Sequence, residues 1–77
     1  MREELRAFIT GELMHEPSYP LKDDEPLMTG GLVASLDLVQ LAVFIEEQFG
    51  VRFDNSELTV DNMDTIDQIA ANIAAKG

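Results

Sequence analysis

The chain has 77 residues, no cysteine and a formal net charge of −10 at pH 7. This length predicts a single small domain over residues 1–77, and the lack of cysteine excludes disulfides and thiolate metal sites. The negative charge argues against nucleic acid and anionic lipid as partners, because binding to either depends on phosphate neutralisation by Lys and Arg. It favours basic protein partners, or else it simply keeps a small domain soluble.

A membrane-spanning helix needs about 20 apolar residues, and no apolar run in the chain approaches that length. The N-terminal segment Met1–Phe8 has mixed charge and lacks the apolar centre of a signal peptide. We therefore expect a soluble, cytoplasmic protein with no membrane contact.

Apolar residues at helical spacing predict a first helix over Met1–Met14. Its apolar face consists of Leu5, Phe8, Ile9 and Leu13. Gly11 weakens this helix by about 1 kcal/mol relative to alanine, an amount that packing can outweigh. Pro17 and Pro20 prevent the helix from continuing.

The segment His15–Ala34 is predicted to be a long loop, because it contains all three prolines, an acidic run and two adjacent glycines. Loops of this length are uncommon in compact domains and are often functional. We expect its apolar side chains to pin it across the helices; these are Leu21, Leu27, Met28, Leu32 and Val33.

A second helix is predicted from Ser35 to Gly50, with Ser35 as the N-cap residue whose hydroxyl accepts a hydrogen bond from a free backbone N–H. Two apolar strips run along this helix. The strip expected to face the core consists of Leu38, Leu41, Ala42, Ile45 and Phe49. The other, here called the outer strip, consists of Leu36, Val39 and Val43, bordered by Gln40, Glu46 and Glu47. The outer strip either packs against a later segment of the chain or docks a partner beside Ser35.

Beyond the second helix, Val51 and Phe53 are expected in the core, and a short helix is predicted at Val60–Met63. Thr65 is expected to cap a last helix that runs from Ile66 to about Ala75. The apolar face of that helix consists of Ile66, Ile69, Ala70 and Ile73. No alternating strand pattern is present, so the periodicity predicts a small all-α bundle with three longer helices and a short one.

The segment GLVASLDLVQLAVFIEEQFGV resembles the central segment of acyl carrier proteins, whose motif is close to GL-I-D-S-L-D-L-V-E-L followed by an acidic, apolar helix. The length, acidity and helix order of the rest of the chain agree with that family. The resemblance implies a four-helix bundle of acyl-carrier-protein type, with a long first loop and a short third helix.

In acyl carrier proteins the motif serine carries a 4′-phosphopantetheine arm, whose thiol holds acyl or aminoacyl groups as thioesters. The matching residue here is Ser35, followed by the matching Leu36 and Asp37. The resemblance implies that a phosphopantetheinyl transferase attaches the arm from coenzyme A and that the protein, a monomer, is not itself an enzyme. A helix N-terminus, with its free N–H groups and partial positive charge, suits an attached phosphate.

The resemblance also implies partners: enzymes that load and process the acyl or aminoacyl group and dock through basic surfaces. Their docking surface on this chain would be Leu36, Asp37, Val39, Gln40, Val43, Glu46 and Glu47. The cargo stays open among fatty acid, polyketide, peptide and D-alanyl or other aminoacyl groups, and with it the choice between fatty acid and secondary metabolite biosynthesis.

Two positions depart from the family motif. Ala34 stands where the motif has aspartate, and Gln40 stands where glutamate is common, so each removes a negative charge near the attachment point. The alternative is therefore a carrier-fold protein that is not primed and acts as a protein–protein interaction module. Such a module would keep its partner complex in a Ser35→Ala variant, whereas a carrier would lose its function.

Catalytic and metal chemistry have less support. His15 is the only histidine, so a Ser–His–Asp triad would require it, and it lies in a solvated segment beside Pro17. Asp54–Asp64 is rich in oxygen ligands, but Thr59 stands at the sixth position, where a calcium loop needs glycine. The sequence predicts neither a catalytic centre nor a dedicated metal site.

Overall fold

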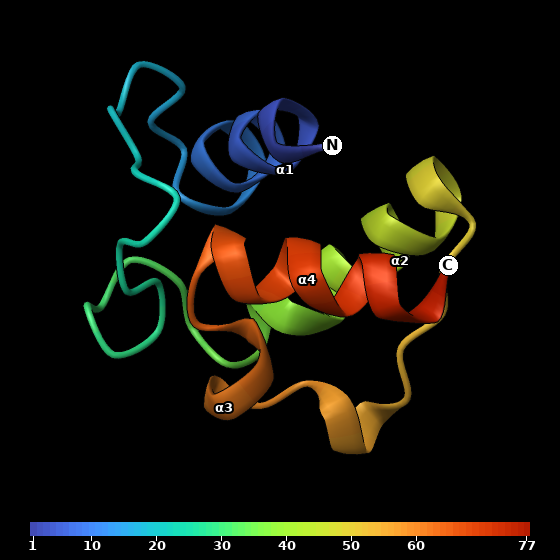
Figure 1. Ribbon diagram of the computed structural model, residues 1–77. Coiled ribbons are helices and arrows are strands. Elements are labelled where there is room, and N and C mark those ends of the chain that lie inside the picture. Colours follow the sequence, from blue (N-terminus) through green and yellow to red (C-terminus); the bar gives the residue numbers. More distant parts are fainter.

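Helices form all the regular secondary structure of the chain, which we describe over residues 1–77 from a computed structural model (Figure 1). The elements are α1 (Arg2–Phe8), a π-helical turn (Ile9–Leu13), α2 (Asp37–Phe49), a 3₁₀ turn (Asn55–Glu57), α3 (Val60–Met63) and α4 (Ile66–Lys76). The prediction of a small all-α domain is confirmed. None of these helices combines the length and the apolar character needed to cross a membrane.

The long loop and the C-terminus lie on opposite sides of the molecule in Figure 1. The loop runs along one side, from the end of the π-helical turn to the start of α2, and the N-terminus lies at the free end of α1. A Cβ on Gly77 would lie 3.4 Å from Cγ2 of Val51, so the C-terminus is close to the end of α2. Helix α4 contacts both α1 and α3.

The core is a single cluster of 16 buried apolar side chains, contributed by α1 to α4, the π-helical turn, the long loop and the segment after α2, where Val51 and Phe53 are buried as predicted. Helix α2 contributes Leu38, Leu41 and Ile45, and α4 contributes the four residues of its predicted apolar face. Of the loop side chains, Leu21, Leu27 and Val33 are buried, while Met28 and Leu32 are partly buried against the cluster. The predicted core face of α4 and the pinning of the loop are confirmed, and so is that of α2 except that Ala42 and Phe49 are only partly buried.

The first helix is not regular over its whole predicted length. Its second half is the π-helical turn, in which the N–H of Met14 donates to the carbonyl of Ile9 at 2.8 Å. In an α-helix, residues four apart lie about 40° beyond a full turn, and a wider π turn offsets this drift. The wide turn thus keeps Leu13 in line with Leu5 and Ile9, and all three are buried.

Charged side chains tie the long loop to the helices. Asp23 accepts hydrogen bonds from the guanidinium groups of both Arg2 and Arg6 on α1, and Arg2 also pairs with Asp67 on α4. Nε of Arg6 donates to the carbonyl oxygen of Leu21 at 3.0 Å. One cluster of ion pairs therefore connects α1, the loop and α4.

Asp64, between α3 and α4, holds the loop near its far end. One carboxylate oxygen accepts the N–H groups of Met28 at 2.8 Å and Thr29 at 3.1 Å, and the other accepts the Thr29 hydroxyl at 2.7 Å. Its carbonyl accepts the N–H of Leu27 at 2.6 Å. Burial acts to raise the pKa of Asp64, but the hydrogen bonds from Thr29 and Met28 outweigh burial and hold the pKa below its usual value.

The start of α4 is capped as the sequence predicts. The hydroxyl of Thr65 accepts the N–H of Gln68 at 3.0 Å, and the side chain of Gln68 accepts the N–H of Asp64 at 2.8 Å. Helix α3 has the predicted bounds, and α4 ends at Lys76, one residue beyond the prediction.

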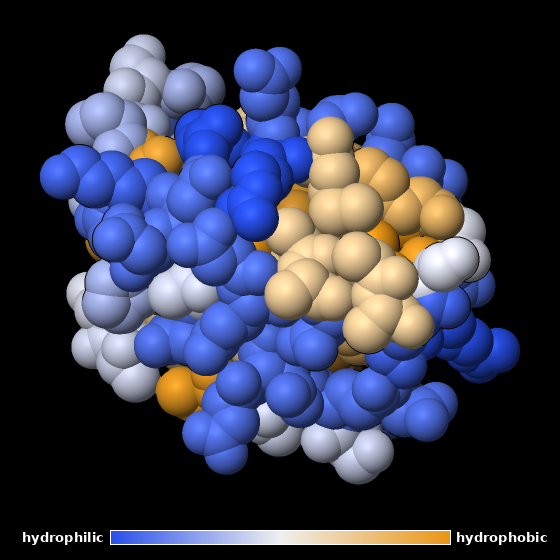
Figure 2. Space-filling view, in the orientation of Figure 1, coloured by the Kyte–Doolittle hydropathy of each residue, from blue (hydrophilic) through white to orange (hydrophobic).

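The outward face of α4 is apolar but built from small side chains. Figure 2 shows a pale apolar patch over α4, bordered by hydrophilic surface on its left and continuing into more strongly apolar surface on its right. The exposed alanines of this helix are Ala71, Ala74 and Ala75. The large exposed apolar side chains of the molecule lie elsewhere, mainly on α2.

Candidate functional site

The chain enters α2 through two successive tight turns. The carbonyl of Leu27 accepts the N–H groups of Leu32 at 2.8 Å and Val33 at 2.9 Å, and the buried Val33 side chain anchors this segment in the core. The carbonyls of Ala34 and Ser35 then accept the N–H groups three residues ahead, at 3.0 and 3.2 Å. The residues Ala34–Leu36 therefore form an exposed turn directly before the helix.

Ser35 is not the N-cap residue of α2, so that prediction is wrong. The helix begins at Asp37 with Leu36 in the N-cap position, and no side chain there accepts a helical N–H. The carboxylate of Asp37 instead reaches back to accept the N–H of Ala34 at 3.0 Å. This is half of a capping box: Ala34 has no side-chain oxygen, and its backbone carbonyl accepts the N–H of Asp37 instead.

The side chain of Ser35 is exposed, and its hydroxyl makes no hydrogen bond within the protein. The free hydroxyl is accessible to a modifying enzyme. The carboxylate of Asp37 lies beside the same turn, so the positive end of the α2 dipole already has a negative neighbour. The site is therefore less favourable to an attached phosphate than a bare helix end.

The two glycines before the turn have structural roles. A Cβ on Gly30 would lie 2.3 Å from the carbonyl oxygen of Pro26, so no larger residue fits there without a shift of the backbone. Gly31 has a φ of +77°, in the left-handed region that glycine adopts at little cost. These glycines make the tight turn that delivers Ser35 to the surface.

The outer strip of α2 is exposed. The exposed fractions of Leu36, Val39 and Val43 are 82%, 54% and 53%. The alternative in which this strip packs against a later segment of the chain is therefore wrong. The bordering Gln40, Glu46 and Glu47 are exposed and Asp37 is partly exposed, so all the predicted docking residues lie on α2 or, in the case of Leu36, at its N-cap position.

Little positive charge lies near the outer strip. The guanidinium of Arg52 is 4.0 Å from a carboxylate oxygen of Glu46, and both side chains are largely exposed. Arg2, Arg6 and Lys76 form ion pairs with carboxylates on other parts of the surface. The strip is an apolar surface with an acidic border, the form that favours a basic partner.

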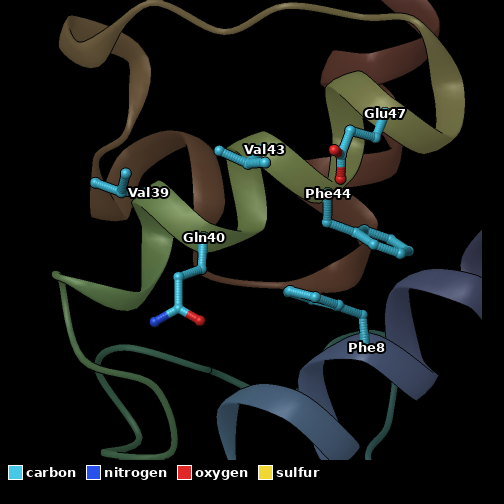
Figure 3. Close-up of a pocket in the computed structure, with 6 residues that line it drawn as sticks. All are labelled: Phe8, Val39, Gln40, Val43, Phe44 and Glu47. Atoms are coloured by element: carbon cyan, nitrogen blue, oxygen red, sulfur yellow. The ribbon is translucent and has the colours of Figure 1, made fainter.

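A groove beside the outer strip was not predicted from the sequence. Phe8 of α1 stacks on Phe44 of α2, with ring centroids 4.3 Å apart and an angle of 16° between the ring planes. Figure 3 shows the two rings meeting between the helices, with Gln40 extending from α2 into the space beside Phe8. This hollow has a volume of about 310 Å³ and is lined by Phe8, Val39, Gln40, Val43, Phe44 and Glu47.

The sequence assigned Phe8 to the core and gave Phe44 no role, but both are only partly buried. The available signal was the position of Phe44, which lies between the two apolar strips of α2 and belongs to neither. A large aromatic residue at such a boundary indicates contact with a neighbouring helix.

The remaining candidates do not join this site. His15 lies exposed after the π-helical turn, with a φ of +58°. No group of three or more His, Asp or Glu side chains is placed to hold a metal ion. The hydroxyl, the outer strip and the groove are the features from which a function can be argued.

No protein-family model matches the chain, and no curated protein matches its sequence. The case for a function therefore comes from the residues around α2.

Proposed function

We propose that this protein is an acyl or aminoacyl carrier, in which Ser35 carries a 4′-phosphopantetheine arm. The observation that carries the proposal is the free, exposed hydroxyl of Ser35 within the segment GLVASLDLVQL, directly before a helix with an exposed apolar strip. The arm supplies the reactive thiol and the reach, and the protein supplies its partners with a surface to recognise.

The attachment is a transfer of one phosphoester. The Ser35 oxygen bonds to the phosphorus that bears the pantetheine chain of coenzyme A, and the pyrophosphate bond of coenzyme A breaks. Adenosine 3′,5′-bisphosphate leaves, and the hydroxyl proton passes to a base of the transferase. Ser35 contributes only the nucleophilic oxygen, and the exposure of its side chain supports access by such an enzyme.

The outer strip and its border would then be read by the partner enzymes. Leu36 supplies apolar area next to the attachment point, while Glu46 and Glu47 supply negative charge along the same helix. Such contacts are small and transient, because each enzyme must release the carrier after its step. Basic residues on the partner speed the encounter and set the orientation.

The test is the intact mass of the purified protein after incubation with coenzyme A, Mg²⁺ and a promiscuous phosphopantetheinyl transferase. We expect a gain of one phosphopantetheine. The Ser35→Ala variant controls for the site, because Ser18 and Ser56 remain in it and should not react.

The Ala34→Asp variant restores the acidic residue of the family motif. It distinguishes a carrier fold that is not primed from a protein that is not a carrier at all. No gain in the unchanged protein but a gain in Ala34→Asp would contradict priming of this chain by such an enzyme and would favour the interaction module. No gain in either protein would overturn the resemblance on which the carrier function rests.

The second candidate is a protein–protein interaction module with no arm. Two observations favour it: the alanine at position 34, and the groove at Phe8 and Phe44, which does not include Ser35. A partner complex isolated from cells that persists with the Ser35→Ala variant would support the module. Loss of the complex in that variant would support the carrier.

A further inference from the structure

The surface between α1 and α2 carries two hollows, one on each side of the stacked rings of Phe8 and Phe44. The first is the one shown in Figure 3, and the second is lined by Glu4, Ala7, Phe8, Phe44 and Gln48. Each has a volume of about 310 Å³, and both are open to solvent. Because both include the two rings, the hollows adjoin at the aromatic stack, and the pair is here called the groove.

The shape of the groove suits a segment of a partner protein better than a small molecule. Small-molecule sites enclose most of the surface of their ligand, and these hollows are too open to do so. Two adjoining hollows match a helix, which presents successive apolar side chains at positions three and four apart. This is the helix-in-groove mode of recognition.

The charges around the groove select a basic occupant. Glu47 is at the edge of the first hollow, Glu4 is at the edge of the second, and no Lys or Arg lines either one. Glu4 has a partner in the N-terminal amine at 2.9 Å, whereas Glu47 has none within the protein. The net charge of −10 adds a long-range attraction for positive partners.

The same charges disfavour a second copy of this chain. A twofold dimer through the groove would set two copies of Glu47 and of the acidic border against each other. Two molecules that each carry a charge of −10 also repel before contact.

We propose that the groove between α1 and α2 docks a basic amphipathic helix of a partner protein, whose apolar side chains enter the hollows on either side of the Phe8–Phe44 stack. Lysine or arginine side chains of that helix pair with Glu47 and its neighbours. The docking surface of the protein is then wider than α2 alone. The inference rests on the partner recognition in the proposed function, but it does not require the arm on Ser35.

The test uses an 18-residue synthetic peptide with leucines on one helical face and lysines on the other, titrated into the isotope-labelled protein. We expect amide shift changes to cluster on Ala7, Phe8 and the part of α2 from Val39 to Gln48. A peptide with the same composition in shuffled order, which has no apolar face, is the control for attraction by charge alone.

Two matched variants locate the contact. Val43→Glu places a charge in the groove and should weaken binding about tenfold, the loss typical of one important contact residue. Val60→Glu makes the same change at another exposed valine, on α3, and should stay within about twofold of the unchanged protein. Ser35→Ala should bind equally well, so failure of priming and failure of this docking site are distinguishable.

Equal binding of the shuffled peptide, or equal weakening by the two valine variants, would overturn the proposal. So would shift changes spread over α3 and the loop. Self-association of the protein alone that Val43→Glu abolishes, measured by sedimentation, would show that a second copy occupies the groove instead.

Discussion

Helices α2 and α4 begin in opposite ways. At the start of α4, Thr65 caps the helix, Gln68 returns a bond to Asp64, and the Asp64 carboxylate holds Met28 and Thr29 of the loop. At the start of α2, the only side-chain hydrogen bond is the one that the Asp37 carboxylate accepts from the N–H of Ala34, and the turn is exposed.

The difference separates a structural helix start from an accessible one. The start of α4 uses its polar groups to fix the loop in place. That loop in turn delivers the turn before α2, whose serine has no partner within the protein. A rigid anchor on one side and a free hydroxyl on the other suit a site that other proteins approach.

The largest effect is expected from Asp64→Ala, which removes the acceptor of three loop hydrogen bonds. The variant should lose about 1–3 kcal/mol of unfolding free energy, because the loop donors lose a charged partner. Urea unfolding of this variant and of Asp24→Ala measures the effect. Asp24 is exposed and makes no such bonds, so equal losses in the two variants would contradict the role of Asp64.

Acid should weaken the same anchor. Since hydrogen bonds hold the folded pKa of Asp64 below its usual value of 3.8, the anchor contributes stability at pH values above that value. This contribution should disappear as the pH falls from about 4 through the lower, folded pKa. The Asp64→Ala variant should therefore lose less stability between pH 5 and pH 2 than the unchanged protein, as measured by thermal unfolding. Parallel losses would show that other carboxylates dominate.

Removing a side-chain hydroxyl should lower the stability of the protein at the start of α4 but not at the start of α2. Thr65→Ala removes a made cap and should cost about 1 kcal/mol. Ser35→Ala removes a hydroxyl with no partner and should change stability by less than about 0.5 kcal/mol. A comparable loss in both, again from urea unfolding, would mean that Ser35 caps α2 after all.

The smallest effect is a gain in stability from a substitution at the start of α2. Ala34→Ser supplies a side-chain oxygen that can accept the N–H of Leu36, which donates to no acceptor in the unchanged protein. We expect a gain of about 0.5 kcal/mol, or a rise of a few degrees in the melting temperature. Ala74→Ser, at an exposed site within α4, is the control and should give no gain. A lower melting temperature for Ala34→Ser would show that the turn geometry does not admit a cap.

Local signals account for the parts of the fold that were predicted well. Threonine before an apolar run marks the start of α4, and the apolar spacing of Ile66, Ile69 and Ile73 gives its buried face. These signals depend only on near neighbours in the chain, so tertiary contacts do not alter the structure that they predict. The exposure of Val39 and Val43, by contrast, depends on which other segments of the chain pack beside α2, and helical spacing alone does not determine it.

The start of α2 could not be predicted, because it depends on distant contacts. Ser35 is the better cap by residue type, but the path of the chain is set by the close approach of Gly30 to Pro26 and by the anchoring of Val33. That path moves the first helical residue on to Asp37. Residue preference was thus overridden by the loop.

The groove and the π-helical turn were missed for a related reason. The stacking of Phe8 on Phe44 joins two helices, and its register depends on how α1 and α2 pack. The wide turn at Ile9–Leu13 has no local marker except Gly11, which also fits an ordinary weak point in an α-helix.

The position of the C-terminus bears on how the protein can be attached to something else. It lies on the side of the molecule opposite the long loop, close to the end of α2 rather than its start (Figure 1). A spacer, a fused domain or a solid support joined at the C-terminus would therefore leave the edge with Ser35 facing outward. Immobilised through that end, the molecule would present this edge to the surrounding solution without any change to its sequence.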